Sequence, residues 1–195
     1  MADPSELMLH VFDEHIKHYG DPDLQFEFNT GDFKLFKRLD VFLWQPSGHN
    51  PMTTFSTMGM ADVPMKGANF RCELHWTIRG KLSETQESEC ASFMSNLVNY
   101  PFLKNTFVDH WHIIPNLIIP SFQQCSNILF HPTFIKDGWD QIQWRTQMVK
   151  ILNIVPLTNE EGQLAKSSGI KIMLDHLYQT QIDIFSNRRL FHAKN

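Results

Sequence analysis

Apolar residues recur at the spacing of an amphipathic helix in three stretches of the chain. Each stretch opens with a capping-box pattern, in which a small hydrogen-bond acceptor is followed three residues later by an acid or an amide. The three pairs are Asp3 and Glu6, Ser83 and Gln86, and Thr158 and Glu161. The apolar stripes run to Tyr19, Val98 and Tyr178. Gly162 and the SSG segment at 167–169 predict a bend or break in the third helix.

Between the first two helices the apolar spacing changes to the period of two that marks β-strands. It is clearest in FRCELHWTIR (70–79), where Glu73 falls on the polar face between Arg71 and Arg79. This pattern predicts that Glu73 is exposed and pairs with one of the two arginines. Further strands are predicted at 24–29, 38–44, 52–59, 110–115, 126–132 and 142–157.

The order of elements is helix, about four strands, helix, strands, helix. Because strands and helices do not alternate regularly, a doubly wound parallel sheet is disfavoured. A chain of 195 residues with 42% hydrophobic content can build one sizeable core. PSGHNP (46–51) is typical of a hairpin loop and not of a domain linker. The sequence therefore predicts a single α+β domain over 1–195, with a mixed or mainly antiparallel sheet packed by helices.

Composition mainly excludes classes of protein. A net charge of −4 argues against a nucleic-acid partner, which would favour a basic face. Cys72, Cys90 and Cys125 lie far apart in the sequence, so buried reduced thiols are favoured over disulfides or a zinc site. No segment approaches the roughly 18 to 20 apolar residues of a membrane helix, and the N-terminus lacks the pattern of a signal peptide. We expect a cytoplasmic protein that does not act at a membrane and needs no cofactor.

Ten histidines raise the question of a metal site. His15 and His18 are close on the first predicted helix, and His110 and His112 would share one face of a strand. No cysteine or paired acid joins either pair at the spacing of metal ligands. Solvated or capped histidines are the simpler interpretation, and we expect no metal.

No complete catalytic motif is present. Ser56 and Ser121 do not lie in G-x-S-x-G, and the chain has no phosphate-binding loop. Asp40 and Glu73 lie on two predicted strands and could serve, with a histidine, as the carboxylates of a metal-dependent hydrolase or nuclease. His75 occupies the position where the lysine of such a nuclease site is expected. We therefore predict no catalytic residues, and the hydrolase remains an alternative.

The segment TMGMADVPM (57–65) resembles the T-x-G-M-S-D-x-P-M signature of the suppressor-of-fused domain family, with Ala61 where serine is common and Met58 where threonine is common. As in that family, it lies between a strand ending in Trp and a strand beginning Arg-x-Glu-Leu. YPF, DHWHIIPN and ILNIVPLTNEEGQLAKSSG follow in the family's order, so the resemblance extends from about residue 25 to 185. The motif residues to which it assigns structural roles are Trp44, Gly59, Met60, Asp62, Pro64 and Met65.

The resemblance implies a non-enzymatic interaction domain. The animal member of the family clamps an extended peptide, which adds a β-strand between two domains. This chain resembles the compact single-domain bacterial members, many of which are assigned as immunity proteins that neutralise a cognate toxin. A protein partner is therefore expected, first a toxin and alternatively the target of a regulatory peptide-binding module. The candidate anchors are Met65, Trp111 and Trp139, which lie near predicted loops and also fit core positions.

Overall fold

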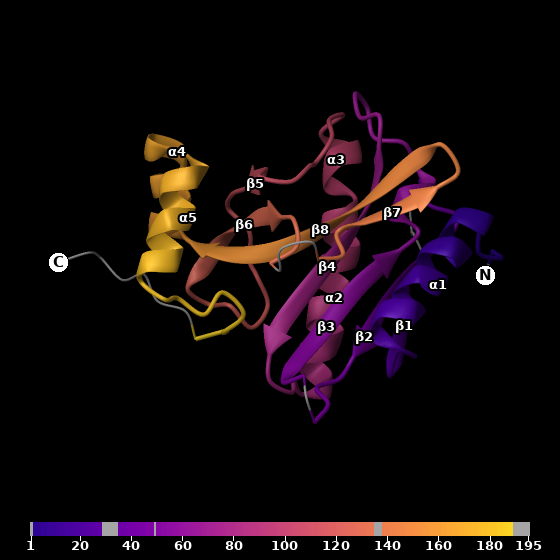
Figure 1. Cartoon of the computed structure of the whole chain (residues 1–195), viewed down its shortest axis with the longest axis horizontal. Helices are drawn as coiled ribbons and strands as arrows, with labels where there is room; N and C mark the ends of the chain where they lie inside the picture. The colour runs from indigo at the N-terminus through magenta and orange to yellow at the C-terminus, as the bar shows by residue number, and fades with distance from the viewer. Residues whose placement is uncertain (1, 29–34, 49, 135–137, 189–195) are drawn as a thin grey trace.

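The computed structural model describes residues 2–28, 35–48, 50–134 and 138–188. Its centre is an eight-stranded sheet in the order β1-β2-β3-β4-β8-β6-β5, with β7 paired to β8 outside that path (Figure 1). Strand β4 runs parallel to β8, and the other pairs are antiparallel. The strands are β1 (Leu24–Phe28), β2 (Leu39–Trp44), β3 (Met52–Met58), β4 (Arg71–Arg79), β5 (Ile113–Ile114), β6 (Cys125–His131), β7 (Gln141–Trp144) and β8 (Gln147–Thr158). The predicted α+β fold with a mixed, mainly antiparallel sheet is confirmed.

The helices begin and end close to the predicted positions. Their bounds are α1 (Glu6–Tyr19), α2 (Glu84–Val98), α3 (Tyr100–Leu103), α4 (Asn159–Ser168) and α5 (Ile170–Gln179), with a short 3₁₀ helix η1 (Met60–Asp62). The capping boxes that begin at Ser83 and Thr158 are confirmed. The predicted break is also confirmed, because α4 ends at Gly169, whose φ of 94° interrupts the helix.

The capping pair predicted for the first helix is wrong. Ser5 caps α1 by accepting a hydrogen bond from the backbone amide of Met8 at 2.9 Å. The Ser5 hydroxyl also donates to Asp62 Oδ1 at 2.6 Å. The start of α1 is thus tied to η1, a contact between residues 57 positions apart that no local pattern reports.

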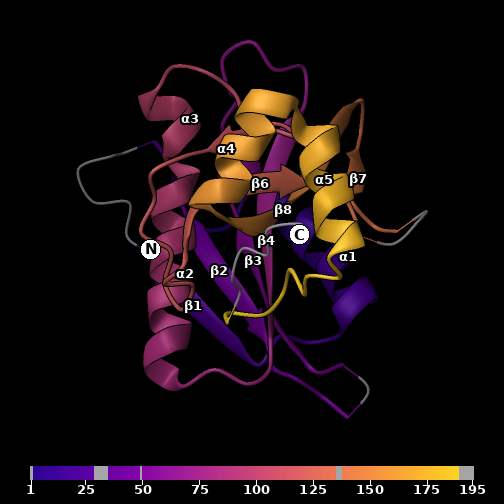
Figure 2. The same cartoon turned by 90° about the vertical axis from the view of Figure 1, so that its left-hand side faces the viewer.

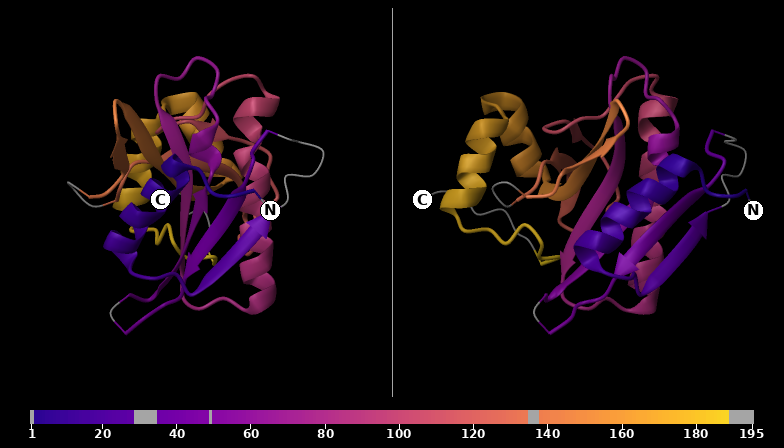
Figure 3. Two further views of the ribbon diagram at one scale, coloured as in Figure 1. Left: turned by 90° about the vertical axis from the view of Figure 1, so that its right-hand side faces the viewer. Right: turned by 45° about the vertical axis from the view of Figure 1, so that its right-hand side comes forward.

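Successive residues of β2 point into two different parts of the core. Val41 and Leu43 pack in the cluster that contains the apolar side of α2, whereas Phe42 and Trp44 pack in the cluster that contains α1. The two helices therefore cover opposite faces of this half of the sheet (Figure 3). Because both faces are covered, all of β2 is buried although it lies one strand from the end of the sheet.

Helices α4 and α5 pack together at the other end of the sheet (Figure 2). Their apolar residues form a third cluster with the ends of β6 and β8. The stretch predicted as one strand at 142–157 is instead two antiparallel strands, β7 and β8, since Arg145 turns the chain with a φ of 53°. None of the described helices is both long and apolar enough to cross a membrane.

Candidate interaction surface

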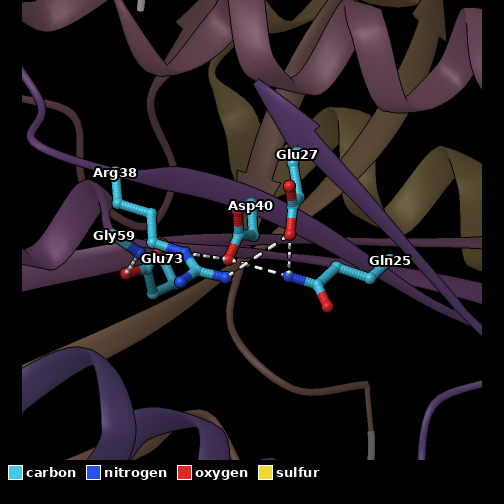
Figure 4. A network of polar contacts seen from close by, with 6 residues as sticks. All are labelled: Gln25, Glu27, Arg38, Asp40, Gly59 and Glu73. Carbon is cyan, nitrogen blue, oxygen red and sulfur yellow. Dashed lines mark hydrogen bonds and ion pairs between the residues drawn. The ribbon is translucent and has the colours of Figure 1, made fainter. Parts of the chain in front are cut away.

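Glu73 lies beneath the 57–65 segment and holds its backbone in place. Its side chain is 0% exposed. The carboxyl oxygens accept hydrogen bonds from the backbone amides of Gly59 at 2.9 Å and Ala61 at 3.0 Å, and from the Thr57 hydroxyl at 2.6 Å. Figure 4 shows the bond to Gly59. Burial raises the pKa of Glu73 to about 7, and these hydrogen bonds oppose that rise.

The predicted exposure of Glu73, and its pairing with an arginine, are therefore wrong. Arg71 donates to the Ala61 carbonyl, and Arg79 pairs with Asp183. The Thr57 hydroxyl and three backbone amides of the turn, those of Gly59, Met60 and Ala61, replace the water that an exposed carboxylate would have. The alternation of apolar and polar residues in β4 correctly placed Glu73 on the polar face of the strand. The segment that follows β3 covers this face, so the side chain is buried.

The other motif residues occupy turn or packing positions. Gly59 has a φ of 114°, and a Cβ atom there would lie 2.4 Å from the Arg38 carbonyl oxygen. Trp44 is buried, and its indole nitrogen donates to the Gly20 carbonyl oxygen at 2.9 Å. Met60 and Met65 are buried, Asp62 accepts from Ser5, and Pro64 is exposed.

Asp40 is also buried, with 1% of its surface exposed. Its Oδ2 atom accepts from Arg38 Nε at 2.7 Å and from Gln25 Nε2 at 3.1 Å (Figure 4). Burial raises the pKa of the Asp40 carboxyl, and the neighbouring Arg38 opposes this. Within the described part of the chain, no group of three or more His, Cys, Asp or Glu side chains is arranged to hold a metal ion. Asp40 and Glu73 therefore serve the packing of the sheet and do not form an open carboxylate pair.

Two of the histidines are neutral core residues. His15 Nδ1 donates to the Val11 carbonyl oxygen at 2.7 Å, so Nε2 accepts from the Ser56 hydroxyl at 2.8 Å. His75 Nδ1 bonds Asn153 Oδ1 at 3.1 Å. Burial lowers the pKa of His15 to about 3 and that of His75 to about 4. The solvated alternative of the sequence interpretation is therefore wrong for His15 and His75, because both rings are buried and hydrogen-bonded.

The three predicted anchors lie in different surroundings. Met65 is 4% exposed and packs in the α2 side of the core, which favours a structural role. Trp139 is half-buried, with its ring 4.6 Å from that of His15 and 4.9 Å from that of His18. Trp111 is 40% exposed and has a φ of 72°. Of the three, Trp111 offers the most accessible ring to a partner.

Trp111 begins a row of aromatic rings that the sequence pattern did not indicate. Its ring lies 4.7 Å from that of His131, which stacks on Phe134 at 4.7 Å with an interplanar angle of 10°. Phe134 in turn meets the edge of Phe185 at 5.1 Å. We call these four residues the aromatic row. It joins residues from three separate parts of the chain, around Trp111, at 131–134 and at Phe185, and for this reason no local motif could reveal it.

A pocket lies at each side of the aromatic row. The first, the Trp111 pocket, has a volume of about 430 Å³, and its lining includes Trp111, Ile113, Asn116, Asn127, Gln163 and Lys166. The second, the Tyr178 pocket, has a volume of about 300 Å³, and its lining includes Leu129, His131, Phe134, Leu177, Tyr178 and Ile184. The first is rich in amides, whereas the second is mainly apolar. His131 and Trp111 are in ring contact, so the two pockets adjoin.

Large apolar side chains are exposed around these pockets. Tyr178 is 87% exposed and Phe134 36%, and both line the Tyr178 pocket. The apolar stripe of the third predicted helix placed Tyr178 in the core, and this is wrong because the stripe is wider than the area that the sheet covers. His131 Nδ1 donates to the Pro132 carbonyl oxygen at 2.8 Å, which leaves Nε2 as an acceptor. The region can therefore take apolar groups together with hydrogen-bonding ones.

The family model for suppressor of fused protein (SUFU) matches residues 37–190. The chain belongs to the suppressor of fused family. The resemblance carried by TMGMADVPM and the segments after it is thereby confirmed. No curated protein matches the chain closely enough in sequence to count as a relative.

Solved structures of the same family share the fold of this suppressor of fused domain. A chain of the Sufu–Fu complex superimposes with a TM-score of 0.70 at 14% identity, covering 97% of this chain and 93% of the other. A SUFU homologue from Neisseria gonorrhoeae FA 1090 gives a TM-score of 0.69 at 13% identity, with 96% and 99% covered. Drosophila Suppressor of Fused gives 0.69 at 15% identity, with 96% of this chain but 51% of that protein covered.

Proposed function

We propose that this suppressor of fused domain is a protein-binding domain whose partner contacts the aromatic row and the two pockets beside it. The observation that carries the proposal is the exposure of Trp111, Phe134 and Tyr178 around adjoining pockets. Exposed aromatic residues set in pockets are typical of the few side chains that dominate binding energy in protein interfaces. The similarity to a chain solved in complex with Fu supports a protein partner.

Polar features of the same region would add specificity. Asn116, Asn127 and Gln163 supply amide donors and acceptors in the Trp111 pocket. Strand β5 ends the described sheet order beside them, and a partner segment could pair with its outer edge. A net charge of −4 would speed association with a basic partner.

We further propose that the partner is a toxin, so that the chain is an immunity protein that neutralises it by direct binding in the cytoplasm. This role needs a preformed surface and no chemistry of its own. The three cysteines are buried and form no disulfide, which supports a reducing compartment. A regulatory peptide-binding module is the second candidate, and the Sufu–Fu complex favours it because that protein is solved with a partner.

The test is a pull-down of the tagged chain from its native cells, followed by quantitative mass spectrometry. Trp111→Ala and Tyr178→Ala remove exposed rings, whereas Leu103→Ala removes an exposed side chain of α3 that is 58% exposed and serves as the matched control. We expect wild type and control to recover the same partner, and each ring variant to recover about tenfold less, as loss of a dominant interface residue does.

Equal recovery by all variants would place the interface elsewhere, and recovery of no protein would contradict a protein-binding role. The identity of the partner separates the two finer proposals. If the recovered protein arrests growth when expressed alone, and co-expression of this chain restores growth, the immunity role holds. Recovery of a harmless cellular protein would favour the regulatory module.

A further inference from the structure

Three sulfur atoms meet beneath the 60–65 segment. Cys72 Sγ lies 3.8 Å from Met60 Sδ and 3.9 Å from Met65 Sδ. The three side chains are 2%, 1% and 4% exposed, respectively. They come from β4, from η1 and from the loop after η1, so the turn of the family motif brings both thioethers onto one thiol.

The thiol cannot satisfy both neighbours. A cysteine S–H carries one hydrogen and can donate to one thioether at a time. One of the two close sulfur contacts therefore always lacks a donor. A soft cation at the centre of the three sulfurs would instead use a lone pair of each.

We propose that Cys72, Met60 and Met65 form a binding site for Cu(I). Metal–sulfur bonds are about 2.3 Å long, and three bonds of this length in a plane, one to the thiolate and two to the thioethers, place the sulfurs about 4.0 Å apart. The two sulfur–sulfur distances of 3.8 and 3.9 Å match this spacing. On binding, the Cys72 S–H bond breaks, a S–Cu bond forms, the two thioethers coordinate through lone pairs, and the proton leaves to solvent.

Charge favours a monovalent ion at this position. One thiolate and one Cu(I) ion form a neutral unit, and a neutral unit avoids the large cost of burying an unpaired charge. A zinc ion in the same place would leave one positive charge, and it prefers four ligands. Thiolate and thioether sulfur are the ligands that select Cu(I) among common metals.

The site is one layer below the surface. Pro64, Lys66 and Gly67 lie in the same loop as Met65, and all three are exposed. The other two thiols, Cys90 and Cys125, are buried and serve as internal references for non-specific binding.

The test is titration of the full reduced chain with Cu(I), kept reduced by ascorbate without oxygen, in competition with a chromophoric Cu(I) chelator. Met60→Leu and Met65→Leu remove one ligand each while nearly conserving volume. Met94→Leu, at a fully buried methionine outside the triad, is the matched control. We expect one ion per chain for wild type and control, affinity weaker by at least about tenfold for each triad variant, and no binding at this site for Cys72→Ser.

Circular dichroism verifies that each variant is folded before titration. X-ray absorption of the copper-loaded protein should report sulfur ligands alone at about 2.3 Å. Failure of wild type to take Cu(I) from the chelator overturns the proposal. Equal affinity in wild type and in either triad variant overturns it as well, because the ion would then be bound adventitiously by another thiol.

Discussion

The backbone amide of Gly59 donates to the Glu73 carboxylate at 2.9 Å, and this bond fastens the turn after β3 to the strand β4 beside it. A buried acid here acts as an internal cap for a turn that has few other backbone bonds. The family motif and the strand that follows it are thus one structural unit.

Replacing Glu73 should destabilise the fold strongly. Glu73→Ala leaves the amides of Gly59 and Ala61 and the Thr57 hydroxyl without their acceptor. Each unpaired buried group costs about 1–3 kcal/mol, so we expect a loss of at least about 3 kcal/mol in the free energy of unfolding. Urea titration followed by circular dichroism measures it. Glu89→Ala, at an exposed site on α2, should change stability by less than about 0.5 kcal/mol. Equal stability of the two variants would contradict the role of Glu73.

Gly59→Ala should also destabilise the protein. The added Cβ would lie 2.4 Å from the Arg38 carbonyl oxygen, and the φ of 114° is unfavourable for any residue with a side chain. We expect a cost of about 1–3 kcal/mol or more, seen as a lower melting temperature. Gly48→Ala is the control, since nothing lies within 4 Å of a Cβ there. A melting temperature for Gly59→Ala equal to that of the control would show that the turn relaxes freely.

Ser5→Ala tests the start of α1. The variant loses the cap on the Met8 amide and the bond to Asp62, so we expect unfolding to become easier by about 1–2 kcal/mol. Asp3→Ala, which changes the residue first expected to cap the helix, should be close to neutral. Chemical denaturation measures the stability of both variants. If Asp3→Ala is the less stable of the two, Asp3 and not Ser5 caps α1.

Stability should fall as the pH drops below 6.5. The pKa values of His15 and His75 are lowered from 6.5 to about 3 and about 4, so the folded state binds fewer protons than the unfolded state in this window. The stabilisation from each neutral histidine is complete above pH 6.5 and decreases by about 1.4 kcal/mol per pH unit below it. Between pH 6.5 and 5 the two histidines together should remove about 4 kcal/mol. Glu73, whose pKa is raised to about 7, takes up a proton in the folded state and returns about 2 kcal/mol, so we expect a net loss of about 2 kcal/mol.

Urea midpoints at pH 7.5 and 5 measure this dependence. His75→Gln should remove most of the net pH dependence, because the remaining contributions of His15 and Glu73 have opposite signs, whereas His112→Gln, at an exposed histidine, should leave it unchanged. If His75→Gln and wild type lose stability equally on acidification, the buried histidine is not the cause.

Local patterns predicted those features that depend on neighbouring residues. The capping boxes at Ser83 and Thr158, the break at Gly169 and the alternation in β4 all follow from contacts within a few positions. The split of 142–157 into two strands was missed because its turn is centred on Arg145, which carries none of the usual turn chemistry.

The candidate site was much less predictable. Trp111 was singled out from its place near a loop, but His131, Phe134, Tyr178 and Phe185 were not. Their rings and the two pockets come together through the packing of β6, α5 and the segment after it. No spacing in the sequence records that proximity, since a histidine and three aromatic residues at these positions form no recognisable local pattern.

The sequence by itself determined the fold class, the family and most element boundaries, because hydrophobic period, capping and the TMGMADVPM motif are local properties. The tertiary structure decided which polar groups are buried and which apolar ones are exposed. Glu73 is buried because the turn after β3 covers it with donors, and Tyr178 is exposed because the sheet ends before it. Burial depends on what lies across from a residue in space, and that is set by the packing of the whole chain.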